Sequence, residues 1–169
     1  MDNGLRGLHL IEPVGLLRWR EWGHPPEPTA PAFWIDNARR EAGRDSLPFT
    51  LIALDPAGTP VGVVGLGDFD QDDLRDHTPW VMGMLVSPAR RAQGIGQALL
   101  EALELHAAAL GHHRLWVATT TATGFYLRCG WQLVGPVTTA AEGPMTVLTR
   151  TRGATSPAHP LPPCGHALP

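Results

Sequence analysis

Near the start of the chain, apolar residues recur at the spacing of a helix. Within residues 5–23 the positions that repeat in this way are Leu10, Val14, Leu17 and Trp22. This repeat predicts an amphipathic helix. Residues 24–31 (HPPEPTAP) form a Pro-rich break. The stretch 32–43 then predicts a short second helix that is closed by Gly43.

Shorter apolar runs follow, and they predict strands. Residues 49–55 and 60–70 are separated by the turn sequence PAGT and predict a β-hairpin. A short helix is predicted at residues 122–130, where it ends at Gly130. Four further strands are predicted at residues 79–86, 114–120, 131–137 and 144–150.

The longest helical pattern begins at Gly94 and ends near Leu110, with Gly111 as its cap. Its apolar face holds Leu99, Leu103, Ala107 and Leu110. Glu101 and Glu104 are expected to lie away from that face.

The order of these elements predicts an α/β fold. Helices come first, then an antiparallel meander, then further strands and helices around a mixed sheet. The 169 residues are enough for one globular domain with a proper core. Residues 151–169 are rich in Pro and Gly, and we expect them to be a weakly ordered tail.

Composition narrows the possible partners and the compartment. The net charge is −3, and the chain contains Arg but no Lys. The sequence therefore does not predict the broad basic surface of a general nucleic-acid binder. The two cysteines, Cys129 and Cys164, exclude a disulfide scaffold. No stretch reads as a membrane span or as a signal peptide. We therefore expect a soluble, cytoplasmic protein that binds neither nucleic acid nor membrane.

The turn sequence SPARRAQGIGQALL (Ser87 to Leu100) has the features of an anion-binding site. A strand that leads through a turn into a helix presents unpaired backbone amides at the positive end of the helix dipole. The P-loop pattern fails because the chain has no Lys, and the dinucleotide fingerprint fails because Leu99 stands at its sixth position. A third phosphate-binding pattern, [QR]-x-x-G-x-[GA], fits fully from Arg91 to Gly96.

Three stretches in the correct order resemble the core of the GNAT (Gcn5-related N-acetyltransferase) superfamily. They are GMLVSPARRAQGIGQALL, LGHHRLWVAT and GFYLRCGWQLV, and the last resembles the family's FYxxxGF/W signature. The sequence TPW at Thr78–Trp80 is similar to one bacterial branch, in which these residues open the central strand. The resemblance covers residues 45–150, while residues 1–44 match loosely and the family's usual first strand is short or missing. We expect 1–44 to be a helical region on the acceptor side, 45–150 the core that binds acetyl-CoA, and 151–169 the tail.

The resemblance implies a single-domain GNAT fold with a mixed, mostly antiparallel central sheet. This sheet is splayed at its centre and flanked by helices. It also implies acetyl-CoA as cosubstrate, with the diphosphate on the turn and the pantetheine arm along the strand end. The cofactor-binding residues implied are Met84, Leu85, Val86, Arg91, Ala92, Gln93, Gly94, Ile95, Gly96, Gln97 and Thr119. For Arg90 and Arg91 the alternative is ordinary surface charge.

Tyr126 is the only tyrosine of the chain, and it falls on the Tyr of the FYxxxGF/W signature. By resemblance it donates a proton to the departing thiolate of CoA. A phenol with a pKa of about 10 can stabilise a thiolate whose conjugate acid has a pKa of about 8.5. The alternative is an aromatic residue that packs on the cofactor. We expect Phe125 and Trp131 to belong to the core, and Cys129 to pack rather than act as a nucleophile.

The stretch from Trp80 to Gly83 lacks the carboxylate that many relatives use as a base. Asp68 and Asp70, from the acidic segment 67–77, could bind a cationic substrate or accept its proton, and His77 is a further candidate base. Without a strong base, the site favours weakly basic amines. At pH 7 roughly one α-amine in seven is neutral, against roughly one lysine side chain in 10³.

We expect no metal site. Asp68, Asp70 and Asp72 have the spacing that opens a calcium loop, but the Gly and Glu that this loop needs are replaced by Asp73 and Pro79. A zinc site at Cys164 and His166 is also not expected.

The predicted function is direct transfer of an acetyl group from acetyl-CoA to the primary amine of a small molecule or peptide. The alternative is a catalytically degenerate GNAT module that binds CoA as a sensor or scaffold. A homodimer is left open.

Overall fold

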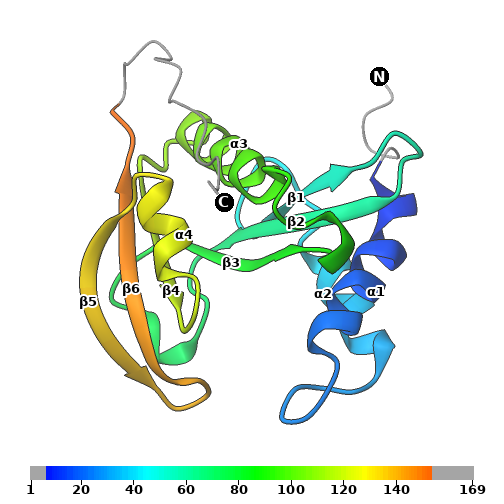
Figure 1. Cartoon of the computed structure of the whole chain (residues 1–169), viewed down its shortest axis with the longest axis horizontal. Coiled ribbons are helices and arrows are strands. Elements are labelled where there is room, and N and C mark those ends of the chain that lie inside the picture. Colours follow the sequence, from blue (N-terminus) through cyan, green and yellow to red (C-terminus); the bar gives the residue numbers. More distant parts are fainter. Residues whose placement is uncertain (1–6, 154–169) are drawn as a thin grey trace, which may run out of the picture. The chain divides into compact units, whose positions relative to one another are not determined.

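The computed structural model describes residues 7–153, and its elements follow the predicted order (Figure 1). The helices are α1 (Ile11–Trp22), α2 (Pro31–Arg40), α3 (Ile95–Ala109) and α4 (Thr123–Arg128). The strands are β1 (Phe49–Leu54), β2 (Pro60–Gly67), β3 (Trp80–Val86), β4 (Arg114–Thr119), β5 (Gln132–Thr139) and β6 (Gly143–Thr151). In the sheet the strands take the order β1-β2-β3-β4-β6-β5. The predicted class is confirmed: a mixed, mostly antiparallel and open sheet with flanking helices.

The described residues fall into two compact units. The first unit contains 7–66 and 82–103, and the second contains 67–81 and 104–153. Strand β3 and helix α3 each contribute residues to both units.

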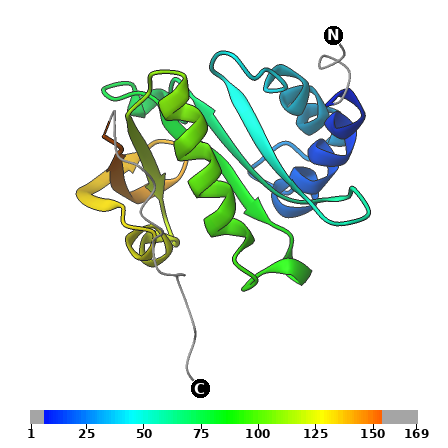
Figure 2. The same cartoon turned by 90° about the horizontal axis from the view of Figure 1, so that it is seen from above.

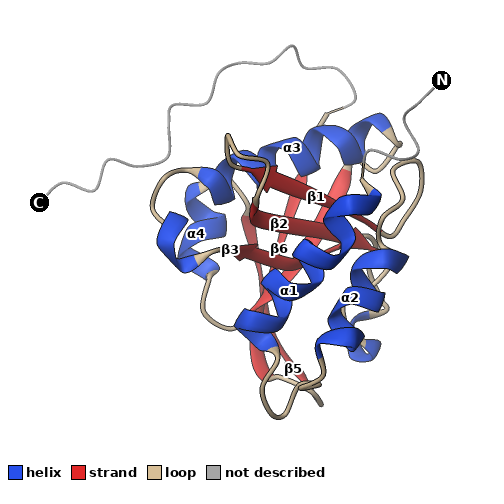
Figure 3. Cartoon of the chain, turned by 90° about the vertical axis from the view of Figure 1, so that its right-hand side faces the viewer, coloured by secondary structure: helices blue, strands red, loops and turns tan. Residues whose placement is uncertain are grey.

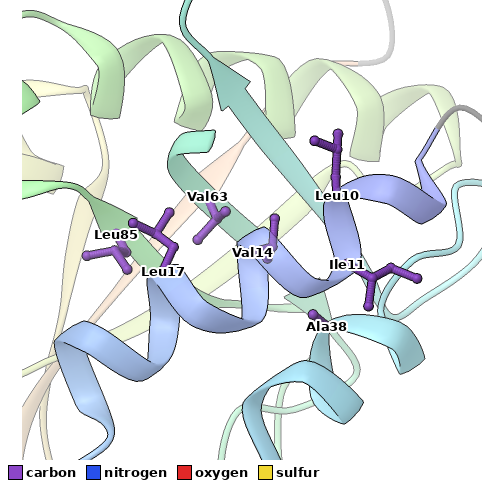
Figure 4. Close-up of a cluster of buried hydrophobic side chains, with 7 residues drawn as sticks. All are labelled: Leu10, Ile11, Val14, Leu17, Ala38, Val63 and Leu85. Carbon is purple, nitrogen blue, oxygen red and sulfur yellow. The ribbon is translucent and has the colours of Figure 1, made fainter. Parts of the chain in front are cut away.

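In the first unit, α1 and α2 lie side by side over one face of β1 and β2 (Figure 3). Gly15 permits this close approach, because a Cβ atom at Gly15 would stand 2.5 Å from the Cα atom of Ile35 in α2. The apolar face of α1 packs on the sheet, and fully burying each such side chain stabilises the fold by about 1.5–3 kcal/mol. The cluster consists of Leu10, Ile11, Val14, Leu17, Ala38, Val63 and Leu85 (Figure 4).

The hairpin of β1 and β2 is antiparallel, with Phe49 opposite Leu66. The first half of α3 lies on the side of this hairpin that faces away from α1 and α2 (Figure 2). Gly62 of β2 makes room for α3, because a Cβ atom there would stand 3.0 Å from the side chain of Leu99 and 3.2 Å from that of Ile95. Covered on both faces, β2 is apolar along nearly its whole length.

An ion pair joins α1 to the end of α2, and hydrogen bonds to Thr50 link this pair to β1. Arg18 is 4% exposed, and its Nη1 lies 2.8 Å from Oε2 of Glu41. The guanidinium also donates to the hydroxyl of Thr50 at 3.0 Å, and this hydroxyl donates to Glu41 at 2.7 Å. Nη2 of Arg18 would stand 3.4 Å from a Cβ atom at Gly83 of β3, where φ is +58°. Only Gly adopts this conformation easily, so Gly83 lets β3 bend beside the buried arginine.

In the second unit, β6 lies between β4 and β5 and is antiparallel to both. The parallel ladder between β3 and β4 consists of the pair Trp80–Trp116. The splay of the sheet stays a prediction. The core of this unit contains Leu74, Trp80, Trp116, Ala118, Met145 and Val147.

Two details of the predictions are wrong. The second helix ends at Arg40, not at Gly43, because Ala42 and Gly43 form β-bridges with Phe49 instead. Glu104 does not lie away from the core, since it is only 4% exposed. Its burial is possible because three donors from other elements bind its carboxylate, as described below. Within residues 7–153 no strand precedes α1, as the loose match of 1–44 indicated.

Candidate active site

The predicted anion-binding turn joins β3 to α3 in the first unit. Its residues from Pro88 to Gly94 are exposed. The backbone is left-handed at Ala92 (φ +60°) and at Gly94 (φ +80°). The first intrahelical bond runs from the amide of Ala98 to the carbonyl of Gly94 at 3.0 Å. The amides just before Ala98 therefore have no carbonyl partner within the helix, which is the arrangement that favours an anion.

Arg91 fastens this turn to its neighbours in the first unit. Its Nε donates to the carbonyl of Val86 at 2.9 Å, and its Nη2 donates to Oε1 of Glu21 in α1 at 2.8 Å. The side chain is 51% exposed, so its charge also reaches solvent. Arg90 lies 3.6 Å from the carboxylate of Asp55. Both arginines are thus held at the turn by acidic partners.

The end of β3 leads into this turn. Leu85 is buried in the core of the first unit, while Met84 and Val86 are half-buried. The amide of Ser87 donates to the carbonyl of Val61 at 2.9 Å, so pairing with β2 continues past the end of the strand. Gly83, immediately before Met84, is left-handed with φ +58°.

Tyr126 lies on α4 in the second unit and is 4% exposed. Its ring packs edge-to-face between Phe125 at 5.2 Å and Trp131 at 5.3 Å between centroids. Burial raises the pKa of Tyr126 well above its usual value, and the charges of Asp70 and Cys129 raise this pKa further. The phenol therefore keeps its proton throughout the physiological range.

The acidic segment is anchored to the second unit rather than extended into solvent. Asp73 accepts a hydrogen bond from the amide of Ala140 at 2.7 Å, and Leu74 is buried. Asp68 and Asp70 are both exposed, and Asp70 lies near enough to Tyr126 to raise its pKa. The structure thus brings together two of the predicted site residues, Tyr126 and Asp70.

The other predicted residues of this unit have structural contacts. The ring of His77 stacks on Trp116, with centroids 3.8 Å apart and planes 5° from parallel. Thr119 accepts a hydrogen bond from the amide of Ala122 at 3.0 Å and so shapes the approach to α4. Cys129 is half-buried.

One buried carboxylate, that of Glu104, was not predicted from the sequence. Glu104 of α3 binds the indole Nε1 of Trp131 at 2.9 Å, and Trp131 packs on Tyr126. A Glu inside an Ala- and Leu-rich helix normally predicts an exposed position, as Glu101 of the same helix shows.

Within residues 7–153, no group of three or more His, Cys, Asp or Glu side chains could hold a metal ion. No helix in that range has the length and apolar character needed to cross a membrane. Cys164 and His166 lie outside the described residues.

Comparison with known families gives a match over most of the chain. The profile of the "Acetyltransferase (GNAT) family" matches residues 12–131. The chain belongs to this family. The predicted family and fold are thereby confirmed, whereas the bacterial branch with a TPW strand stays a prediction.

Individual relatives of this GNAT chain have low sequence identity to it. It is 33% identical to mouse (Mus musculus) N-alpha-acetyltransferase 80 over 124 residues, which are 71% of this chain and 40% of the mouse protein. The GNAT chain thus spans about two fifths of the length of that relative. Among solved structures it is similar to an aminoglycoside 6'-N-acetyltransferase complexed with coenzyme A, with 15% identity and a TM-score of 0.69. The match covers 89% of this chain and 94% of the other.

A protein from Salmonella typhimurium, solved with its cofactor acetyl-CoA, is similar to the GNAT chain at 16% identity. Its TM-score is 0.65, and the match covers 90% of this chain and 93% of the other. At these identities the two structures support the fold alone.

Proposed function

We propose that the protein transfers an acetyl group from acetyl-CoA to a primary amine. The exposed turn at the start of α3, left-handed at Ala92 and Gly94, carries this proposal. A Cβ atom at Gly94 would meet nothing within 4 Å, so the backbone there is open to a ligand. Unpaired amides, an open backbone and a held arginine, Arg91, together fit a diphosphate.

The chain would hold acetyl-CoA through backbone groups. The turn from Arg91 to Gln97 binds the diphosphate, and the main chain of Met84–Val86 pairs with the pantetheine arm as an added strand would. Thr119 contributes from the end of β4. Bound in this way, acetyl-CoA supplies an acyl group that is already activated as a thioester. The side chains of the protein would protonate the departing thiolate and bind the acceptor amine.

Tyr126 is proposed as the general acid. The phenol is protonated at neutral pH whether or not its pKa is raised, so its hydroxyl can donate a hydrogen bond to the departing sulfur and stabilise the thiolate as it forms. Because the ring is clamped between Phe125 and Trp131, the direction of the O–H group is restricted.

The acceptor is proposed to be an α-amine or another weakly basic amine, on a small molecule or a peptide. The stretch from Trp80 to Gly83 carries no carboxylate, and Asp70 is the acidic group near Tyr126. Asp68 and His77 are the further candidates for contact with substrate. The mouse relative is named for N-alpha-acetylation, which agrees with this substrate class.

The missing strand carboxylate favours a second candidate, a GNAT module that binds CoA as a sensor or scaffold without transferring acetyl groups. Calorimetry with CoA and release of free thiol from acetyl-CoA with a panel of amines separate the two. A sensor would bind CoA and release no thiol with any amine.

The first prediction concerns Tyr126→Phe. Since general-acid catalysis contributes typically about 10²–10⁴-fold, we expect kcat to fall about 100-fold or more. Affinity for CoA in calorimetry should stay within about twofold, because the turn is untouched. A variant with full kcat would refute the role of Tyr126, and a wild-type protein without heat of CoA binding would refute the whole proposal.

A further inference from the structure

Glu104 has a buried carboxylate with three donors, and the proposed reaction gives it no role. It is 4% exposed on α3. Oε1 accepts from the indole Nε1 of Trp131 at 2.9 Å. Oε2 accepts from Nε of Arg152 at 2.9 Å and from Nε of Arg150 at 3.3 Å. Both carboxylate oxygens are therefore paired, all within the second unit.

The two arginines fix this carboxylate from the side of β6. Their side chains are 21% and 27% exposed, so they shield Glu104 from solvent while reaching solvent themselves. Arg150 also donates to the carbonyl of Gly130 at 2.7 Å, just after α4. A buried charge cluster of this kind is weak support for stability, because apolar residues of similar volume often stabilise a core as well. We therefore ask which side chains this charge cluster holds in place.

That geometry concerns the ring of Trp131. This residue is 2% exposed, and its amide donates to the carbonyl of Tyr126 at 3.0 Å. The far end of the ring is fixed by Glu104, and one edge-to-face contact of the ring is with Tyr126, at 64° between planes. The indole is thus held at both ends, and the phenol of Tyr126 packs against it.

We propose that Glu104 is a positioning residue for Tyr126 and acts through Trp131. The carboxylate holds the indole in one orientation, the indole limits the tilt of the phenol, and the phenol hydroxyl keeps one direction. This inference rests on the proposed function only in assigning a proton transfer to Tyr126. The mechanical link itself is a property of the second unit.

The test compares Glu104→Gln with Glu101→Gln, which changes an exposed Glu one turn earlier on the same helix. In Glu104→Gln the arginines compete for the single amide oxygen, so the amide NH2 group turns toward Trp131 and the indole loses its acceptor. We expect kcat to fall about tenfold or more, because small misplacements of a catalytic group can reduce rates up to about 100-fold. KM for acetyl-CoA should stay within about twofold.

A second readout does not depend on activity. Since Tyr126 is the only tyrosine, protein labelled with carbon-13 on the tyrosine ring gives the signals of this residue alone. Glu104→Gln should shift or broaden them, and Glu101→Gln should leave them as in the wild type. A purely structural role would lower the melting temperature but leave the ring signals and kcat per folded molecule unchanged.

If Glu104→Gln does not fold, Trp131→Phe replaces it, because Phe keeps an aromatic ring and removes the N–H donor. Its kcat should fall likewise, and the fall should vanish when Tyr126→Phe is already present. Unchanged kcat in Trp131→Phe, or wild-type ring signals in Glu104→Gln, would overturn the inference. If instead Tyr126→Phe keeps full activity, the proposed general acid is wrong, while the ring signals still decide whether Glu104 positions the phenol.

Discussion

Tyr126 shows how the surroundings of one residue set its chemistry. Burial is the main cause of its raised pKa, with the charges of Asp70 and Cys129 as further causes. The unfolded chain binds the phenolic proton with a pKa of about 10. Above that pH the folded protein holds more protons than the unfolded one, so the free energy of unfolding must fall as pH rises. Below about pH 10 the contribution of Tyr126 is constant.

The difference between the pKa of Tyr126 in the folded and in the unfolded chain predicts how the absorbance of the protein changes with pH. Tyrosinate absorbance should appear at a higher pH in the folded protein than for free tyrosine. The free energy of unfolding should fall by up to about 1.4 kcal/mol per pH unit above pH 10. Tyr126→Phe serves as the control, because it removes both the absorbance change and this part of the pH dependence. Ordinary titration near pH 10 in the folded state would contradict the buried placement.

Two residues of the second unit show what could be predicted from the sequence. Tyr126 can be predicted as a site residue because its signature lies within one short stretch, where neighbours in sequence are neighbours in space; its role stays a prediction. The burial of Glu104 was not predicted, because the helical repeat indicates only which face of α3 is apolar. It does not indicate which residues pack against the other faces of the helix. Arg150 of β6 and Arg152, just after this strand, lie far from Glu104 along the chain. No local sequence pattern could therefore predict that they pair with its carboxylate.

At the scale of elements, the turn between β3 and α3 carries the fourth prediction. Gly94→Ala places a Cβ atom at a left-handed position, which costs about 1–2 kcal/mol of stability. Among residues 7–153, apart from the two chain neighbours, no atom lies within 4 Å of that Cβ, so strain is the expected effect on folding. If a phosphate lies against this backbone, the same methyl group blocks it. Affinity for CoA in calorimetry should then fall more than about tenfold.

Ala92→Gly is the matched control for the turn. It removes a side chain from the neighbouring left-handed residue, where φ is +60°. Relief of strain is offset by the greater freedom of Gly in the unfolded chain, so stability should change little. Affinity for CoA should also be kept. A Gly94→Ala variant that binds CoA like the wild type would show that the backbone of this turn does not hold the cofactor.

Most elements were predicted because hydrophobic spacing is a local property. The hairpin of β1 and β2, the helix α3 and the pair β5–β6 all begin and end within a few residues of the predicted bounds. The end of α2 was missed, because Ala42 and Gly43 pair with Phe49 of β1. This pairing depends on a contact with another element. A local helix-ending signal such as Gly43 does not predict such a contact.

At the scale of the whole molecule, each of the two units carries its own set of proposed site residues. The turn and the end of β3 belong to the first, and Tyr126 and Asp70 belong to the second. Each set carries a motif that identifies it. The acceptor side carries none: helices α1 and α2 and the segment 67–79 show ordinary packing patterns, so the substrate class must be argued from acid–base chemistry instead.

That argument gives the last prediction. With no strand carboxylate between Trp80 and Gly83, the neutral fraction of the acceptor amine should govern the rate. Two peptides test this: one with a free N-terminus and no Lys, the other with a blocked N-terminus and one Lys. At pH 7 we expect kcat/KM to favour the free N-terminus by about 100-fold or more. Between pH 7 and 9 this preference should shrink about tenfold, because an α-amine of pKa about 7.8 is soon fully neutral while the neutral fraction of a lysine side chain keeps rising.

A preference for Lys at pH 7, or a ratio that does not change with pH, would mean that the protein supplies a strong base after all. Asp70→Asn would then be the variant to measure.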